Sequence, residues 1–216
     1  MYDASGSQDI KPGRSPRDER LSRAVVVNAA IEIARRDGLN ALSMRRLAEE
    51  LGVSTMAAYR HVASKDTLVD DVLEAIVETI SLETTESDWQ KQIEQLAVRS
   101  YRVFLEVPGI TDHLHGRALV RPAVVRWLEA LIQPLVDAGI ETGSRAGFTT
   151  SLVWLLRGAT RLSDEWNATI NALEEIATEG PEDSSNMRSG RNDLGEQQAE
   201  DLLVTGMHLL LGGLTR

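Results

Sequence analysis

The spacing of apolar residues in the first third of the chain predicts a series of short helices. Apolar positions recur at intervals of three and four residues, which is the spacing of one buried stripe on a helix. Three such stripes follow one another: Val27, Ala30, Ile31 and Ala34; then Met44, Leu47, Ala48 and Leu51; then Leu68, Val69, Val72, Leu73, Ile76 and Ile80.

Polar residues and glycines mark the ends of these predicted helices. Ser43, Ser54 and Ser64 each stand just before a helical segment, so we expect them to be N-caps. Gly38 is a predicted left-handed C-cap, and Gly52 allows a sharp turn between the second and third helices. Two short helices joined by a tight glycine turn match a helix-turn-helix.

The rest of the chain is also predicted to be helical. We expect helices at about residues 88–107, 122–139, 144–166 and 194–214, with a kink at Pro134. Residues 111–116 are a short segment of unassigned type, and the polar stretch 178–193 is predicted to be a mobile loop. Since no alternating strand pattern is present, the fold class is all-α.

The predicted third helix, residues 54–61, has the sequence STMAAYRH, which offers little apolar bulk for a core. We expect Ala58 and Val62 to anchor it on the two preceding helices. The other residues then face outward or lie on the flanks: Thr55, Met56, Ala57, Tyr59 and Arg60. Small residues permit approach to a DNA major groove and longer ones reach bases and phosphates, so this face is a predicted DNA-binding surface.

The charge distribution is compatible with a nucleic-acid partner despite a net charge of −10. Residues 1–66 hold eleven Lys or Arg against nine Asp or Glu, whereas residues 67–216 hold twelve against twenty-four. Because phosphate affinity depends on local charge, a mildly basic head on an acidic body can still bind DNA.

The segment of about residues 21–80 resembles the N-terminal domain of TetR-family transcriptional repressors. The resemblance includes the Gly-Val turn, the Tyr-x-His-Val ending of the third helix and the Ser-Lys-Asp-x-Leu start of the next. Residues 113–140 and 147–166 are similar in layout to the C-terminal domain of tetracycline repressors. The resemblance implies a regulator, more specifically a repressor, that binds double-stranded operator DNA as a homodimer and is released by a small-molecule effector of unknown identity.

These features predict three parts: a disordered arm (1–20), a helix-turn-helix DNA-binding domain (21–66) and a ligand-binding and dimerisation domain (67–216). Four basic residues of the arm could reach a minor groove, but four acidic residues balance them and favour a plain tail. Helices 144–166 and 194–214 are the predicted dimer interface, with an internal core helix as the alternative for the second.

The resemblance implies a base contact for Arg45, for which the alternative is a solvated surface arginine. Met56 could meet a thymine methyl or be a partly buried anchor, and Tyr59 could contact phosphate or belong to the core. Ser43 and Ser54 are caps first and DNA contacts second. The predicted DNA-binding residues are Ser43, Arg45, Ser54, Thr55, Met56, Ala57, Tyr59, Arg60, His61 and Lys65.

Scattered aromatic and polar residues of the middle helices are candidates for the effector site, although each aromatic could instead be a core residue. The predicted ligand-binding residues are Trp89, Tyr101, Phe104, His113, His115, Trp127, Trp154 and Arg157. A metal at His113 and His115 is disfavoured, since two histidines two apart on a helix do not share a face.

Other functional classes find little support in the sequence. No Gly-rich phosphate loop, His-Glu-x-x-His motif or nucleophile elbow is present, so no enzyme activity and no cofactor are predicted. An enzyme with an unrecognised site and a helical scaffold that has lost DNA binding are the alternatives. The absence of cysteine suits a reducing cytoplasm, and no apolar run approaches the roughly 20 residues that span a membrane.

Overall fold

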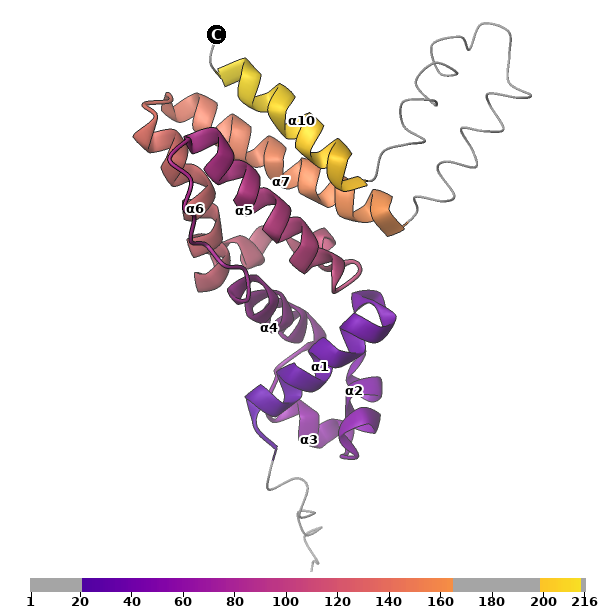
Figure 1. Ribbon diagram of the computed structural model, residues 1–216. Helices are drawn as coiled ribbons and strands as arrows, with labels where there is room; N and C mark the ends of the chain where they lie inside the picture. The colour runs from indigo at the N-terminus through magenta and orange to yellow at the C-terminus, as the bar shows by residue number, and fades with distance from the viewer. Residues whose placement is uncertain (1–20, 165–198, 215–216) are drawn as a thin grey trace, which may run out of the picture.

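The computed structural model describes residues 21–164 and 199–214, and every regular element in these two ranges is a helix. The predicted all-α fold is therefore confirmed (Figure 1). The predicted arm, the polar loop 178–193 and the first residues of the last predicted helix lie outside the described ranges.

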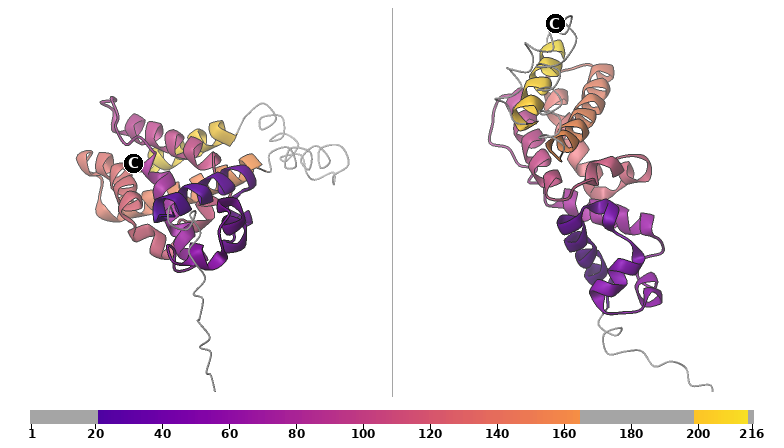
Figure 2. Two further views of the ribbon diagram at one scale, coloured as in Figure 1. Left: turned by 90° about the horizontal axis from the view of Figure 1, so that it is seen from below. Right: turned by 90° about the vertical axis from the view of Figure 1, so that its right-hand side faces the viewer.

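The N-terminal helices form a small head at one end of an elongated molecule (Figures 1 and 2). It contains α1 (Arg23–Asp37), α2 (Met44–Leu51) and α3 (Thr55–Tyr59), and the short 3₁₀ helix η2 (Leu39–Ala41) joins the first two. Helix α4 (Lys65–Glu78) then leads into the body and packs on α1 as well as on the helices of the body. Because α4 belongs to both halves, the boundary at residue 66 stays a prediction.

Serine caps fix the starts of these helices, as expected. The side chains of Ser43, Ser54 and Ser64 accept hydrogen bonds from the backbone N–H three residues later, at 3.2, 3.1 and 3.0 Å. Ser22 caps α1 in the same way, a cap that the sequence analysis missed.

The two glycines of the head adopt different conformations. Gly52 ends α2 in the left-handed region with φ 64° and ψ 35°, which confirms the predicted tight turn. Gly38 also has a positive φ, but its ψ of 155° is extended, so the prediction of a left-handed cap is wrong. The extended ψ carries the chain away from α1, and the next residue, Leu39, donates its backbone N–H to the carbonyl of Pro108 in the body at 2.9 Å.

The body contains α5 (Trp89–Leu105), α6 (Pro122–Asp137), α7 (Thr142–Asp164) and α10 (Ala199–Leu214). These helices begin and end within a few residues of the predicted positions, except where the last helix starts outside the described ranges. Residues 111–116 fall in two 3₁₀ helices, η3 (Ile110–His113) and η4 (Gly116–Val120), and the turn between them. Helix α6 continues through Pro134 as a single element.

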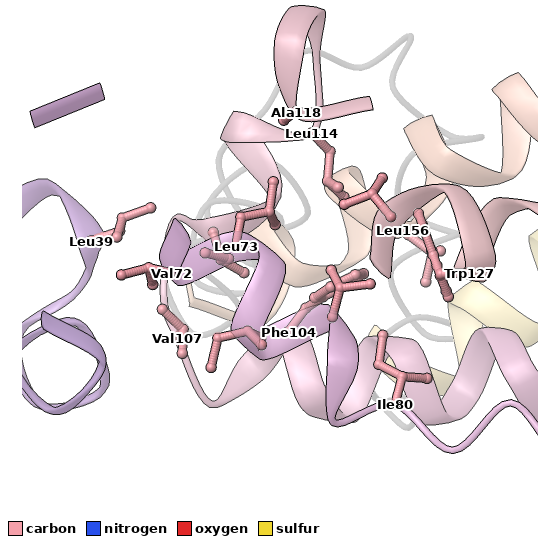
Figure 3. Packing of buried hydrophobic residues seen from close by; sticks show 14 of the residues in the cluster. Leu39, Val72, Leu73, Ile80, Phe104, Val107, Leu114, Ala118, Trp127 and Leu156 are labelled. Carbon is pink, nitrogen blue, oxygen red and sulfur yellow. The ribbon is translucent and has the colours of Figure 1, made fainter. Parts of the chain in front are cut away.

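One apolar core runs from the head into the body. Leu39, Val72 and Val107 lie where the two meet, and the cluster continues through Phe104 and Leu114 to Trp127 and Leu156 (Figure 3). Trp127 is fully buried and donates its indole N–H to Ser100 Oγ at 2.8 Å, which satisfies the one polar group that its burial would otherwise strand. No helix in the described ranges is long and apolar enough to cross a membrane.

Candidate functional site

Helices α2 and α3 form a surface on the part of the head that faces away from the body (Figure 1). Ala58 and Val62 are buried and anchor α3, as predicted. Met56 is 70 % exposed and Tyr59 is 42 % exposed, so neither is a core residue. Two large side chains that are left in solvent on a five-residue helix are free to contact an external partner.

Ala57 was predicted to belong to the DNA-binding surface, but it is buried. Its side chain is 1 % exposed because α3 packs directly on α2, and Ala57 shares the packed face with Ala58. A small residue here permits the close approach of the two helices, so its role is structural. The other nine predicted DNA-binding residues are exposed or partly exposed: Ser43, Arg45, Ser54, Thr55, Met56, Tyr59, Arg60, His61 and Lys65.

The two arginines at the start of α2 have different surroundings. Arg45 has a side chain that is 83 % exposed and makes only an i,i+4 contact with Glu49 at 3.3 Å. An exposed pair of this kind contributes little to stability, so the guanidinium can exchange Glu49 for another partner. Arg46 instead bonds to Asp37 at 2.6 Å and ties α2 to the end of α1.

A buried carboxylate joins the head to the body. Asp71 on α4 is 6 % exposed and accepts hydrogen bonds from Arg23 on α1, at 2.8 and 2.9 Å, and from Arg121 at the start of α6, at 2.7 Å. Glu74, one turn later, accepts from Arg121 Nε at 3.1 Å and from the backbone N–H of Ala123 at 2.9 Å.

Electrostatics favour this arrangement. Burial alone would lower the pKa of the Arg121 guanidinium, but its hydrogen bond to Asp71 and the charges of Asp71 and Glu74 raise the pKa above its usual range. Arg121 therefore stays charged.

A second contact holds the other end of α1. Arg35 pairs with Glu106 at 3.0 Å, close to the Leu39–Pro108 backbone bond. The head is thus connected to the body near both ends of α1, and a change in its orientation must disturb at least one of the two connections.

The body contains a cavity of about 300 Å³ between the 114–119 segment, α6 and α7. Its apolar lining is Leu114, Leu119, Leu128, Val153 and Trp154, and its polar lining is His115, Thr149, Thr150 and Arg157. Three predicted ligand residues, His115, Trp154 and Arg157, therefore meet at one cavity. The two threonines were not predicted, since a threonine on a long apolar helix carries no signal of its own in the sequence.

Three other predicted ligand residues belong to the core. Tyr101, Phe104 and Trp127 are buried, and the Phe104 and Trp127 rings meet edge to face with centroids 5.6 Å apart. They are buried because each lies on the core-facing side of an amphipathic helix. A core position was the alternative that the sequence left open for each aromatic residue. Trp89 lies at the start of α5, partly buried against the core and away from the cavity.

His113 and His115 lie closer together than expected. Their rings stack with centroids 6.4 Å apart, because η3 ends at His113 and His115 precedes η4, so they do not share one helix. The two side chains are therefore not separated by their spacing, contrary to the prediction. Burial and then the neighbouring His115 lower the pKa of His113, which favours its neutral form. Within residues 21–164 and 199–214, no group of three or more potential metal ligands is present.

Helices α7 and α10 pack on each other and keep apolar residues in solvent. A Cβ on Gly206 would lie 3.1 Å from Leu155 Cδ2, so this glycine serves contact within the chain. Trp154 on α7 and Leu209 on α10 are 66 % and 76 % exposed, while Leu210 packs against the core. Because Trp154 also lines the cavity in the body, Leu209 is the side chain that a second copy could cover.

Comparison with known proteins agrees with the geometry. Residues 26–72 match the model of the family described as bacterial regulatory proteins, tetR family. The chain is 26 % identical over 204 residues to the tetracycline repressor protein class C of Escherichia coli, covering 91 % of this chain and 92 % of that protein. It is also 26 % identical over 207 residues to the HTH-type transcriptional repressor DrrR1 of Streptomyces coeruleorubidus, covering 82 % and 76 %.

The fold is shared with a solved structure. The Streptomyces coelicolor TetR family protein ActR in complex with (S)-DNPA superposes with a TM-score of 0.77 at 21 % identity, over 90 % of this chain and 97 % of that one. The matched N-terminal domain, the near full-length relatives and the common fold together support a TetR-family regulator.

Proposed function

We propose that the chain is a ligand-responsive repressor that binds operator DNA as a homodimer. The observation that carries this function is the α2–α3 surface, where buried Ala58 and Val62 hold exposed Arg45, Met56 and Tyr59 on a rigid scaffold away from the body. The family match over this same region supports a role in DNA binding.

The residues of the surface divide into two chemical roles. Arg45 is the candidate for a bidentate contact to guanine, and Met56 for an apolar contact to a thymine methyl. Tyr59, His61 and Lys65 are the candidates for phosphate contacts, which set affinity and orientation rather than sequence preference.

Dimerisation would place two such surfaces on one face of the DNA. Recognition helices must lie about 34–36 Å apart to enter successive major grooves. The exposed apolar residues of α10, Leu209 above all, together with the adjoining face of α7, are the proposed contact with the second copy, in a four-helix bundle about a two-fold axis.

A small molecule bound in the body would control the head through α4. Helix α4 carries Asp71, which bonds both to α1 and to the start of α6, so movement of α6 reaches the head directly. Suppose that an effector binds more tightly when the head is in an orientation that does not fit DNA. Saturating effector then weakens operator binding by the ratio of the effector's affinities for that orientation and for the DNA-binding one. The ligand-bound structure of ActR supports a body of this fold as a binding site.

The test is selection of an operator from a random double-stranded library, followed by titration at several salt concentrations. If a dimer neutralises about six to ten phosphates, operator affinity should fall by roughly three to five decades between about 50 and 200 mM salt. A selection that yields no common sequence, or an affinity that does not respond to salt, would remove DNA from the proposed function.

A further inference from the structure

A buried hydroxyl on α7 lacks a hydrogen-bond partner. Thr149 is 8 % exposed, and its Oγ1 atom meets no donor or acceptor among the residues described. An unpaired hydroxyl removed from water costs free energy, and natural proteins rarely leave one without a reason.

Another threonine on the same helix shows that α7 can satisfy such a group. Thr160 is similarly buried, but its Oγ1 bonds to the carbonyls of Leu156 at 3.1 Å and Arg157 at 3.0 Å and to Thr111 Oγ1 at 2.9 Å. Thr149 therefore differs from Thr160 in the partners that surround it rather than in residue type.

Thr149 lies in the wall of the cavity of about 300 Å³ in the body. This volume is at the lower end of the range for small-molecule sites. One part of the wall is apolar and includes the indole of Trp154, which offers a flat surface to a ring system.

The polar part of the wall consists of donors and a cation. His115 and Arg157 line the cavity together with Thr149 and Thr150, and no carboxylate from residues 21–164 or 199–214 does. Arg157 forms an ion pair with Asp112, whose Oδ1 lies 3.8 Å from Arg157 Nη2, too far for a hydrogen bond. The guanidinium of Arg157 thus keeps hydrogen-bonding capacity toward a bound acid.

We propose that this cavity binds an amphipathic organic anion. Its apolar body lies against Leu119, Leu128 and Trp154, and its acidic group pairs with Arg157. Thr149 Oγ1 is closed to water in the free protein, so a small shift of the wall on binding lets an acceptor atom of the ligand receive its hydrogen bond. A cationic ligand would meet the guanidinium of Arg157 inside the cavity, since the Asp112 carboxylate that faces Arg157 is not part of the described lining. A polar ligand such as a sugar would leave the leucine wall without a partner. The inference rests on the proposed function, because such an anion would be the effector.

A matched pair of fluorescent probes tests the ligand class without knowledge of the natural effector. One is 8-anilinonaphthalene-1-sulfonate, and the other is N-phenyl-1-naphthylamine, which has the same rings and no sulfonate. Titrated into the wild-type dimer without DNA, the anion should bind at one site per protomer and about tenfold or more tighter than the neutral probe. Equal affinities of the two probes would overturn the proposal.

The variant Arg157→Gln separates charge recognition from apolar binding. It should weaken the anion about ten- to a hundredfold and leave the neutral probe unchanged, so that the preference disappears. If Arg157→Gln leaves anion affinity unchanged, the anion does not use this cavity and the proposal fails.

The two threonines give a matched control. Thr149→Val removes a hydroxyl that has no protein partner, so it should weaken the anion about two- to tenfold and leave thermal stability unchanged or raised. Thr160→Val removes a bonded hydroxyl, so it should lower stability and leave probe affinity unchanged. Loss of stability in Thr149→Val, or equal probe affinities in the two variants, would contradict the assignment.

Failure of this inference can be told apart from failure of the proposed function. If the selected operator binds but the anion shows no preference, the ligand class is wrong while the regulator function stands. If the anion binds as predicted but no operator is found, the cavity stands and the regulator function falls.

Discussion

The head and the body of this chain present their candidate functional groups in opposite ways. The head exposes Arg45, Met56 and Tyr59 on a small buried scaffold, whereas the body places Thr149 and Arg157 in the wall of a cavity. DNA is large and rigid, so a protein that binds it needs side chains that project from a surface. A small molecule binds most tightly where it is removed from water on several sides. The difference predicts different responses to mutation.

The largest expected effect is on the contact between copies. Leu209→Glu places a charge on the exposed face of α10, where a partner would bury it, and should yield folded monomers that no longer bind operator. Analytical ultracentrifugation and circular dichroism check this outcome. The control is Val136→Glu, which changes a half-exposed apolar residue on α6; it should remain a dimer. A Leu209→Glu dimer with full operator affinity would move the interface elsewhere.

The connection between head and body comes next in size. Asp71→Asn leaves Arg23 and Arg121 without their shared charged partner and should lower the free energy of unfolding by about 1–3 kcal/mol, since both arginines keep some contact with water. Urea denaturation measures the loss.

A matched control for Asp71→Asn lies on the same two helices. Glu78→Gln breaks the exposed pair with Arg126 and should change the free energy of unfolding by less than about 0.5 kcal/mol. Equal losses in Asp71→Asn and Glu78→Gln would mean that burial of Asp71 is not what makes the connection strong.

The smallest effects concern single contacts on the DNA surface. Arg45→Ala should weaken operator binding by roughly 1–3 kcal/mol and relax selectivity at one base pair per half-site. Lys65→Ala should weaken binding to all sequences about equally, because phosphates are common to every sequence. Competition between operator and random duplexes distinguishes the two. The same loss on both duplexes in both variants would make Arg45 a phosphate contact only.

The head was predictable from the sequence because its determinants are local. Ser43 and Ser54 cap helices that begin one residue later, and the Gly52 turn lies between them, so a short window contains the whole motif. Ala57 was wrongly predicted to be exposed, because periodicity does not determine which face of a five-residue helix packs against its neighbour. Gly38 was misassigned because its ψ depends on Pro108, which is 70 positions away.

The effector cavity was less predictable because it is assembled from distant segments. Residues 114, 128 and 157 meet only after α6 and α7 have packed, so their spacing in the sequence carries no signal. Tyr101, Phe104 and Trp127 share the residue types of a ligand site, but packing placed them in the core. The unpaired hydroxyl of Thr149 is visible only once every neighbour of its oxygen is known.

The most direct test of the whole account is whether cavity and DNA surface are coupled. The affinity of the dimer for 8-anilinonaphthalene-1-sulfonate would be measured alone, with saturating operator, and with a scrambled duplex at the same concentration. Coupling is reciprocal, so operator should weaken the probe by the same factor by which the probe weakens operator, typically about 5- to 150-fold. The scrambled duplex should have no such effect. Equal probe affinity with and without operator would contradict ligand-controlled DNA binding through this cavity.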